Sequence, residues 1–250
     1  MKKFLAMVLT AILGSVCLTA CGNTQATEQT ISTRDATTTT VEPSPEWVAS
    51  LTEAKDAKQL FVVAGVGDTT AYVSMHQKDA DGKWQQIVST PGYIGKKGLF
   101  KEKEGDAKTP VGVFHFTEAF GIAPDPGCAI PYHQVGEDDY WSGDPNYNYN
   151  KMVQLSNYPQ LNKEDSEHLI EVNPQYEYAL NISYNEEGTA GLGSAIFLHC
   201  LGPQKPYTGG CVAIPRAQME IVMKNVSPDC VVVINTLQEI APDLYKDWDL

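Results

Sequence analysis

The sequence has 250 residues, of which 42% are apolar and 20% charged, and its formal net charge is −13 at pH 7. This length and composition are typical of one globular domain with additional segments. The acidic balance offers no basic face for a nucleic-acid partner. The sequence also contains no internal repeat, phosphate-binding loop or paired-cysteine metal motif, so we expect neither nucleic acid nor a bound metal.

The first twenty residues are typical of an export signal. Two lysines precede an apolar run at residues 4–16, which is too short to span a bilayer comfortably. The following L-T-A-C-G, with Cys21 as its cysteine, resembles a bacterial lipobox. The resemblance implies a signal peptide over residues 1–20, lipidation of Cys21 and an extracytoplasmic protein anchored to the cytoplasmic membrane. The alternative is an ordinary signal peptide that happens to contain cysteines.

Residues 21–45 are predicted to be the lipidated cysteine and a flexible linker. The segment is rich in threonine and has almost no large apolar side chain, so it cannot bury a core. As a flexible coil it would have an r.m.s. span of roughly 25–30 Å, which suits a tether.

Residues 46–59 are predicted to form a short helix, because their apolar side chains fall on one face and Ser44 can cap the first turn. The periodicity then changes to that of strands at 60–66, 71–76 and 84–90. Between the last two, Asp81-Gly82 indicates a hairpin turn. We therefore expect a sheet-rich domain over residues 60–237.

A loop at residues 92–108 precedes a strand predicted at 109–117, with Pro110 near its start. The loop carries five lysines, which would attract a carboxylate-bearing peptide, although such clusters are more often solvated. The lysines are Lys96, Lys97, Lys101, Lys103 and Lys108.

The segment 119–162 is a long insertion that is rich in aromatic residues and has little helical or strand periodicity. Long loops of this kind often cover a site, so we interpret the segment as one wall of a groove for peptide or sugar. The alternative is a small satellite core under a long loop. The candidate groove residues are Tyr132, Trp141, Asp144, Tyr149 and Asn150.

The stretch 194–215 holds the strongest chemical signal. An apolar run at 195–198 ends in His199, and Thr208-Gly209-Gly210-Cys211 leads into a second apolar run at 212–214. Two buried segments joined by one short loop can bring a histidine and a cysteine together. The glycines let backbone N–H groups approach a ligand. These are the parts of a thiol nucleophile with a base and oxyanion donors, although a buried cysteine is more often an inert small hydrophobe.

The rest of the chain is predicted to contain a strand at 178–185, a helix at 215–225, a strand at 230–235 and a C-terminal tail at 238–250. Cys128, Cys200 and Cys230 are also available, so at most one disulfide can form if Cys211 is a free thiol.

Two motifs together resemble the YkuD-type L,D-transpeptidases. His199 is followed twelve positions later by the cysteine of T-G-G-C-V-A-I-P. Upstream, G-D-A-K-T-P-V-G-V-F at residues 105–114 is similar to that family's G-x-x-x-T-P-x-G-x-F run. The resemblance covers roughly residues 60–235 and rests on both motifs in the same order.

The resemblance implies a mainly β fold with short helices, a β-sandwich of mixed sheets whose Cys/His site lies in a groove under the aromatic segment. It implies that Cys211 attacks peptidoglycan stem peptides and that His199 is its general base and acid. It further implies Gly210 as a backbone oxyanion donor, with Thr208 and Gly209 beside the substrate. No cofactor is needed, because the thiol itself carries the acyl group as a thioester. The resemblance also implies that the protein acts outside the cytoplasmic membrane, on the side that faces the cell wall.

The sequence departs from the commonest family pattern, S-H-G-C, because Gly209 stands where that pattern has its second histidine. It is closer to a branch that writes T-x-G-C. Ala213 stands where the family usually has an arginine, so the group that binds a substrate carboxylate stays open. Two alternatives to transpeptidation also stay open: an L,D-carboxypeptidase that uses water, and an inactive wall-binding lipoprotein on the same fold.

Overall fold

The computed structural model describes residues 41–203 and 205–247. The predicted signal peptide, Cys21 and the linker up to residue 40 lie outside the described residues. Within the described ranges, no helix combines the length and the apolarity that crossing a membrane requires.

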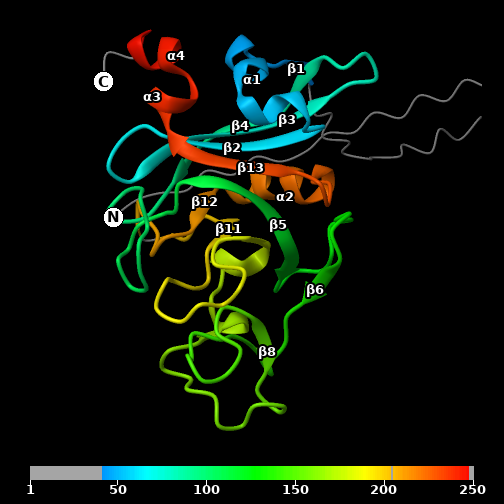
Figure 1. The fold of residues 1–250 in the computed structure, drawn as a ribbon. Helices are drawn as coiled ribbons and strands as arrows, with labels where there is room; N and C mark the ends of the chain where they lie inside the picture. The colour runs from blue at the N-terminus through cyan, green and yellow to red at the C-terminus, as the bar shows by residue number, and fades with distance from the viewer. Residues whose placement is uncertain (1–40, 204, 248–250) are drawn as a thin grey trace, which may run out of the picture. The chain divides into compact units, whose positions relative to one another are not determined.

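Eight strands form a sheet that closes on itself (Figure 1). In spatial order β4, β12, β11, β10, β5, β13, β2 and β3 are neighbours, and β3 pairs back onto β4. Their bounds are β2 Gln59–Gly65, β3 Thr70–Lys78, β4 Trp84–Tyr93, β5 Gly112–Gly121, β10 Ala179–Ile182, β11 Phe197–Cys200, β12 Val212–Ile214 and β13 Val231–Thr236. Two short strands extend the sheet, β1 (Glu42–Pro43) along β4 and β6 (Tyr132–Gln134) along β5. Closure pairs strand edges that would otherwise be open.

The expected mainly β fold with mixed sheets is confirmed. The β11–β12 and β13–β2 pairs are parallel, whereas the other pairs around the ring are antiparallel. The closed, barrel-like sheet fits the term sandwich only loosely, because the same sheet supplies both walls of the core.

Strand β2 is buried on both faces, which explains its unbroken apolar sequence. Phe61 and Val63 face the main core inside the sheet, where α2 (Arg216–Asn225) adds Met219. Leu60 and Val62 face a second cluster on the opposite side. That cluster is covered by α1 (Glu46–Ser50), the 3₁₀ turn Thr52–Lys55, α3 (Leu237–Ile240) and α4 (Pro242–Asp247).

At the two ends of the domain, the structure differs from what the sequence predicts. The predicted helix over 46–59 is divided into α1 and a 3₁₀ turn. The Ser44 cap is wrong: Pro45 occupies the N-cap position, and the Ser44 hydroxyl lies 2.8 Å from His76 Nδ1. The predicted tail contains α3 and α4, which pack on the second cluster.

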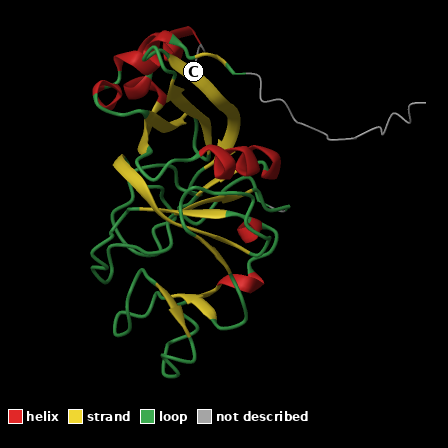
Figure 2. Ribbon diagram, turned by 90° about the vertical axis from the view of Figure 1, so that its right-hand side faces the viewer, coloured by secondary structure: helices red, strands yellow, loops and turns green. Residues whose placement is uncertain are grey.

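The aromatic insertion has more regular structure than its sequence pattern indicates. Its strands β7 (Asp139–Trp141) and β8 (Met152–Gln154) form a three-stranded sheet with β9 (Glu167–His168), which follows the insertion in the chain. The spatial order is β8, β7, β9. Tyr140, Val153 and Leu161 form a small core beside it. Figures 1 and 2 show this sheet at the opposite end of the domain from α1, α3 and α4. Strands of two or three residues are too short to show a periodicity, which is why the sequence does not reveal them.

Candidate active site

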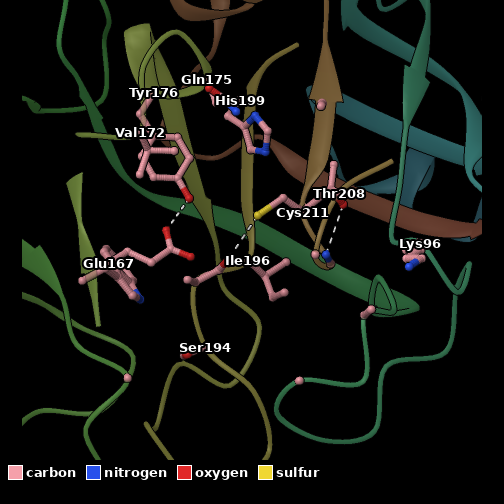
Figure 3. A pocket seen from close by; sticks show the side chains of 18 of the residues that line it. Lys96, Glu167, Val172, Gln175, Tyr176, Ser194, Ile196, His199, Thr208 and Cys211 are labelled. Atoms are coloured by element: carbon pink, nitrogen blue, oxygen red, sulfur yellow. Dashed lines mark hydrogen bonds between the residues drawn. The ribbon is translucent and has the colours of Figure 1, made fainter. Parts of the chain in front are cut away.

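The pairing register of β11 and β12 places Cys211 and His199 on one face of the sheet. The two strands are parallel neighbours, with His199 opposite Ala213 and Leu198 opposite Val212. Side chains alternate along a strand, so Cys211, two residues before Ala213, points to the same side as His199. In Figure 3 the imidazole ring and the sulfur lie in one pocket, and both residues line the same cavity.

Cys211 is a buried thiol at rest. The residue is 8% exposed, its Sγ donates to the Ala195 carbonyl oxygen at 3.1 Å, and Phe197 N–H donates to Sγ at 3.3 Å. Burial raises the pKa of Cys211 to about 12, and the negative charge of Glu167 acts in the same direction. The thiolate is therefore scarce at neutral pH, and the thiol must lose its proton as it attacks.

His199 is poised as a neutral proton acceptor. Its Nδ1 lies 2.8 Å from the Cys200 carbonyl oxygen, so Nδ1 carries the proton and Nε2 keeps its lone pair. Burial lowers the pKa of His199 to about 4, and the bond to the Cys200 carbonyl opposes that shift. Because Sγ–H is directed to Ala195, the thiol must turn before it can meet Nε2. Catalytic hydrogen bonds often form only when substrate is bound.

Two threonines hold the loop that carries the thiol. Thr208 Oγ1 donates to the Cys211 carbonyl oxygen at 2.6 Å and accepts from Gly210 N–H at 3.1 Å. Thr109 Oγ1 donates to the Gly210 carbonyl oxygen at 2.7 Å and accepts from Gly95 N–H at 2.9 Å. The T-P motif and the T-G-G-C motif are thus joined directly, although a hundred residues separate them.

The loop also requires glycine at one of its two glycine positions. Gly210 has a φ of +152°, and a Cβ there would stand 2.8 Å from the Lys108 carbonyl oxygen. A Cβ on Gly209 would meet nothing within 4 Å. The backbone therefore allows only glycine at position 210, whereas position 209 has room for a larger side chain.

The cavity has a volume of about 1050 Å³ and lies between the strand ends and the insertion. Of the residues predicted for the site, seven line it: Thr208, Gly209, Gly210, Cys211, His199, Trp141 and Tyr149. The insertion therefore forms one wall of the cavity and also has its own small core, so both readings of its sequence describe part of it.

The other three candidate groove residues, Tyr132, Asp144 and Asn150, lie outside the cavity lining. The Tyr132 hydroxyl donates to the Ala123 carbonyl oxygen at 2.7 Å. Asp144 accepts the N–H groups of Asn146 and Asn162 at 2.8 and 2.9 Å. All of these bonds hold the insertion itself, and a substrate contact for these residues stays a prediction.

Asn150 connects the insertion to the thiol. Its Oδ1 accepts from Trp141 Nε1 and from Ala195 N–H, both at 3.0 Å, and its Nδ2 donates to the Tyr184 and Asn185 carbonyl oxygens. Because the Ala195 carbonyl oxygen accepts a hydrogen bond from the Cys211 thiol, Asn150 fixes the segment before β11 that positions the resting thiol.

Sequence reasoning missed two acid–tyrosine pairs in the cavity wall. The Tyr176 hydroxyl donates to Glu167 Oε2, and the Tyr149 hydroxyl donates to Glu104 Oε2 at 2.5 Å. Both glutamates line the cavity. Glu167 comes from a two-residue strand and Tyr176 from a 3₁₀ turn, segments with no pattern that would single them out.

The family model of the YkuD L,D-transpeptidase catalytic domain matches residues 57–234. The chain belongs to this family. The match includes the whole stretch from β2 into β13, and with it both motifs that join at Thr109. A comparison with curated proteins finds no match.

Solved structures similar to this L,D-transpeptidase domain share little sequence with it. One is the helical cell shape determining protein Pgp2 from Campylobacter jejuni, with 18% identity, a TM-score of 0.36, and coverage of 76% of this chain and 54% of that one. Another is a cysteine-to-serine mutant of the Enterococcus faecium L,D-transpeptidase, with 14% identity, a TM-score of 0.33, and coverage of 72% and 50%. The chain thus spans about half the length of the structures it matches.

The lysine-rich loop of this L,D-transpeptidase domain supplies two of its lysines to the cavity lining, Lys96 and Lys101. Lys101 is buried and bonds to Asp106 at 3.0 Å. Lys96 is exposed, with its Nζ 5.4 Å from the centre of the Tyr207 ring. The positive charge of Lys101 is therefore neutralised within the loop, whereas Lys96 can meet an anionic group in the cavity.

The four described cysteines, Cys128, Cys200, Cys211 and Cys230, are free thiols. Cys200 follows His199 in β11 and packs in the main core on the other face of the sheet. In the part of the chain that the structure describes, no group of three or more His, Cys, Asp or Glu side chains could hold a metal ion.

Proposed function

We propose that this chain is a peptidoglycan L,D-transpeptidase that forms crosslinks between the third residues of stem peptides through a thioester on Cys211. The observation that carries the proposal is the placement of a neutral His199 and the Cys211 thiol on one sheet face, opening into one cavity. The family assignment supplies the class of reaction. The T-x-G-C branch and the lipid anchor at Cys21 belong to the same proposal.

In the first half-reaction, Cys211 Sγ attacks the carbonyl carbon that precedes the terminal D-residue of a stem tetrapeptide. The pKa of about 12 makes a standing thiolate rare, so Sγ–H turns from the Ala195 carbonyl to His199 Nε2 and is transferred during the attack. His199 then protonates the leaving amine. D-alanine departs, and the acyl group stays on Sγ as a thioester.

The developing oxyanion needs N–H donors, and the N–H groups of Gly210 and Cys211 are proposed for that role. Gly210 N–H is held by Thr208 Oγ1 at 3.1 Å in the resting state, so it would exchange that acceptor for the oxyanion. A charged acceptor makes the stronger hydrogen bond. Removing one such donor costs about 3–4 kcal/mol of transition-state stabilisation in other acyl-transfer enzymes.

In the second half-reaction, an amine of a second stem attacks the thioester, and the crosslink forms. Lys96 is the cavity residue proposed to meet the substrate carboxylate in place of the arginine that Ala213 replaces. Its exposed ammonium lines the cavity. The whole protein is proposed to act from a lipid anchor outside the cytoplasmic membrane, facing the cell wall.

Intact mass spectrometry of the protein incubated with a purified stem tetrapeptide tests this proposal. We expect a covalent adduct of one tripeptide acyl group on Cys211, and a crosslinked dimer once an amine acceptor is added. Cys211→Ser is the control and should form no thioester. Release of free tripeptide with no dimer would show an L,D-carboxypeptidase, and the absence of both adduct and product would show an inactive wall-binding protein.

A further inference from the structure

The cavity contains a carboxyl group beside the nucleophile that the first half-reaction does not use. Glu167 comes from β9, which pairs with strand β7 of the insertion, and its Oε2 accepts a hydrogen bond from the Tyr176 hydroxyl. In Figure 3 the Glu167 carboxyl group, from β9, and the Cys211 sulfur, from the loop before β12, both point into the cavity. The two groups are close enough for the charge of Glu167 to raise the pKa of Cys211.

A carboxylate in that position hinders the first step, because it opposes formation of the thiolate. Its presence therefore calls for another task. We infer that Glu167 binds the ammonium of the acceptor peptide and removes its first proton in the second half-reaction. The inference deepens the proposed function and rests on it.

Proton balance requires an acceptor for a second proton. An aliphatic ammonium has a pKa near that of lysine, about 10.4, so the acceptor arrives as R–NH₃⁺. When it attacks, a C–N bond forms and the C–S bond breaks, and the nitrogen loses two protons to become an amide N–H. One proton passes through His199 to the departing sulfur. The other proton, which the ammonium must lose before its nitrogen can attack, has no place on the Cys211–His199 pair, and the Glu167 carboxylate accepts it and releases it to solvent.

The surroundings of Glu167 suit proton acceptance. Burial raises its pKa, the Tyr176 hydrogen bond opposes that shift, and the negative charge of Glu104 adds to it. Tyr176 from the 3₁₀ turn and Glu104 from the lysine-rich loop are titratable groups that act on Glu167, and Glu167 in turn acts on Cys211 from the site loop. A carboxylate with a raised pKa is a stronger base than an exposed one, and it also attracts a cation.

The pair is placed against the catalytic histidine by packing. The centre of the Tyr176 ring lies 5.5 Å from the ring centres of both His199 and Phe197, and both ring pairs are edge-to-face. Glu167 pairs with Trp141 across the small sheet. The small sheet thus places the carboxylate on the side of the site opposite Lys96, with Cys211 between them (Figure 3).

The test separates acylation from aminolysis in the full chain. Glu167→Gln keeps an acceptor for the Tyr176 hydroxyl and removes the charge. We expect donor-driven release of D-alanine within about threefold of the parent, while attack by a stem tripeptide with a side-chain amine falls by about tenfold or more, the low end of a lost general base. The thioester should then accumulate. The control is Glu171→Gln, which removes a charge close to Glu167 in the sequence, on a side chain that is 75% exposed.

A neutral nucleophile distinguishes proton acceptance from a structural role. Hydroxylamine is uncharged at neutral pH, so it should resolve the thioester of Glu167→Gln at about the parent rate. The deficit with the amine acceptor should also narrow as the pH rises from 7 to 9. An equal loss with hydroxylamine would reduce Glu167 to a structural residue, and no loss with the amine would refute the inference. Failure of the proposed function would instead show in the parent, either as no acyl-enzyme or as an acyl-enzyme that the amine acceptor does not resolve.

Discussion

At the scale of single residues, the site depends on one glycine that cannot be exchanged. A Cβ at Gly210 would press on the Lys108 carbonyl oxygen, and its φ of +152° disfavours any other residue. We expect Gly210→Ala to lower the free energy of unfolding by about 1–3 kcal/mol and to slow acylation of Cys211. Gly209→Ala is the matched control for folding, because its Cβ meets nothing within 4 Å. Urea unfolding of both variants measures the difference, and equal stabilities would contradict the argument.

The pKa values of Cys211 and His199 also differ from those of a free cysteine and a free histidine. A free cysteine has a pKa of about 8.5 and a free histidine about 6.5. Burial moves them apart, the pKa of Cys211 to about 12 and that of His199 to about 4. The resting pair is therefore thiol and neutral imidazole, and proton transfer belongs to the attack itself.

At the scale of elements, the two motifs act as one unit through Thr109. Its buried hydroxyl donates to the Gly210 carbonyl and accepts from Gly95 N–H. Thr109→Val should therefore leave both partners unsatisfied. We expect a loss of about 1–3 kcal/mol in the free energy of unfolding, together with slower acylation. Thr109→Ser keeps the hydroxyl and should restore most of both. A valine variant that matches the serine variant in denaturant midpoint and acylation rate would show that the junction is dispensable.

The sequence predicts the long strands and the Cys/His pair, and it misses what depends on contacts between distant segments. Strands such as β2 and β3 carry enough alternating or continuous apolar residues to be seen. The stretch around His199 and Cys211 indicates two adjacent buried segments, and these are the neighbours β11 and β12. By contrast, β9 has two residues, so Glu167 stands out only once the fold brings it to the cavity. The position of Tyr132 is likewise decided by the pairing of β6 with β5, and that of Asp144 by a local turn, neither of which aromatic content alone reveals.

At the scale of the whole molecule, two buried histidines make the fold sensitive to acid. Burial lowers the pKa of His76 and of His199 to about 4, and His76 is held between the Ser44 and Ser74 hydroxyls. The unfolded chain, with a histidine pKa near 6.5, binds more protons than the folded one between pH 6.5 and 4, so stability falls as the pH drops through that window. The effect is at most roughly 3 kcal/mol per histidine.

Unfolding free energies measured from pH 7 to 4 test this sensitivity. We expect the parent to lose stability steadily below pH 6.5 and His76→Asn to show a shallower slope. Carboxyl groups with lowered pKa values, such as Asp106, change the free energy of unfolding only at lower pH. They would therefore not produce this slope. A slope that is unchanged in His76→Asn would mean that His76 does not carry the effect.

The proposed anchor is also a property of the whole chain. If Cys21 carries lipid, Cys21→Ala should move the protein from the membrane fraction to the soluble fraction, because the acyl chains supply the membrane affinity. Fractionation in high salt, which removes electrostatic attachment, measures this. A variant that stays with the membrane would place the attachment elsewhere.

The central claim, that His199 removes the proton from a buried Cys211 thiol, is tested most directly by the acylation rate of Cys211 as a function of pH. In the parent, the rate should rise as His199 loses its proton near pH 4 and then stay level through neutrality. In His199→Ala, the rate at pH 7 should fall by about 10²–10⁴-fold and keep rising with pH, since ionisation of a thiol with a pKa of about 12 is then the only route. A His199→Ala protein that is acylated at the parent rate near neutrality would contradict the account.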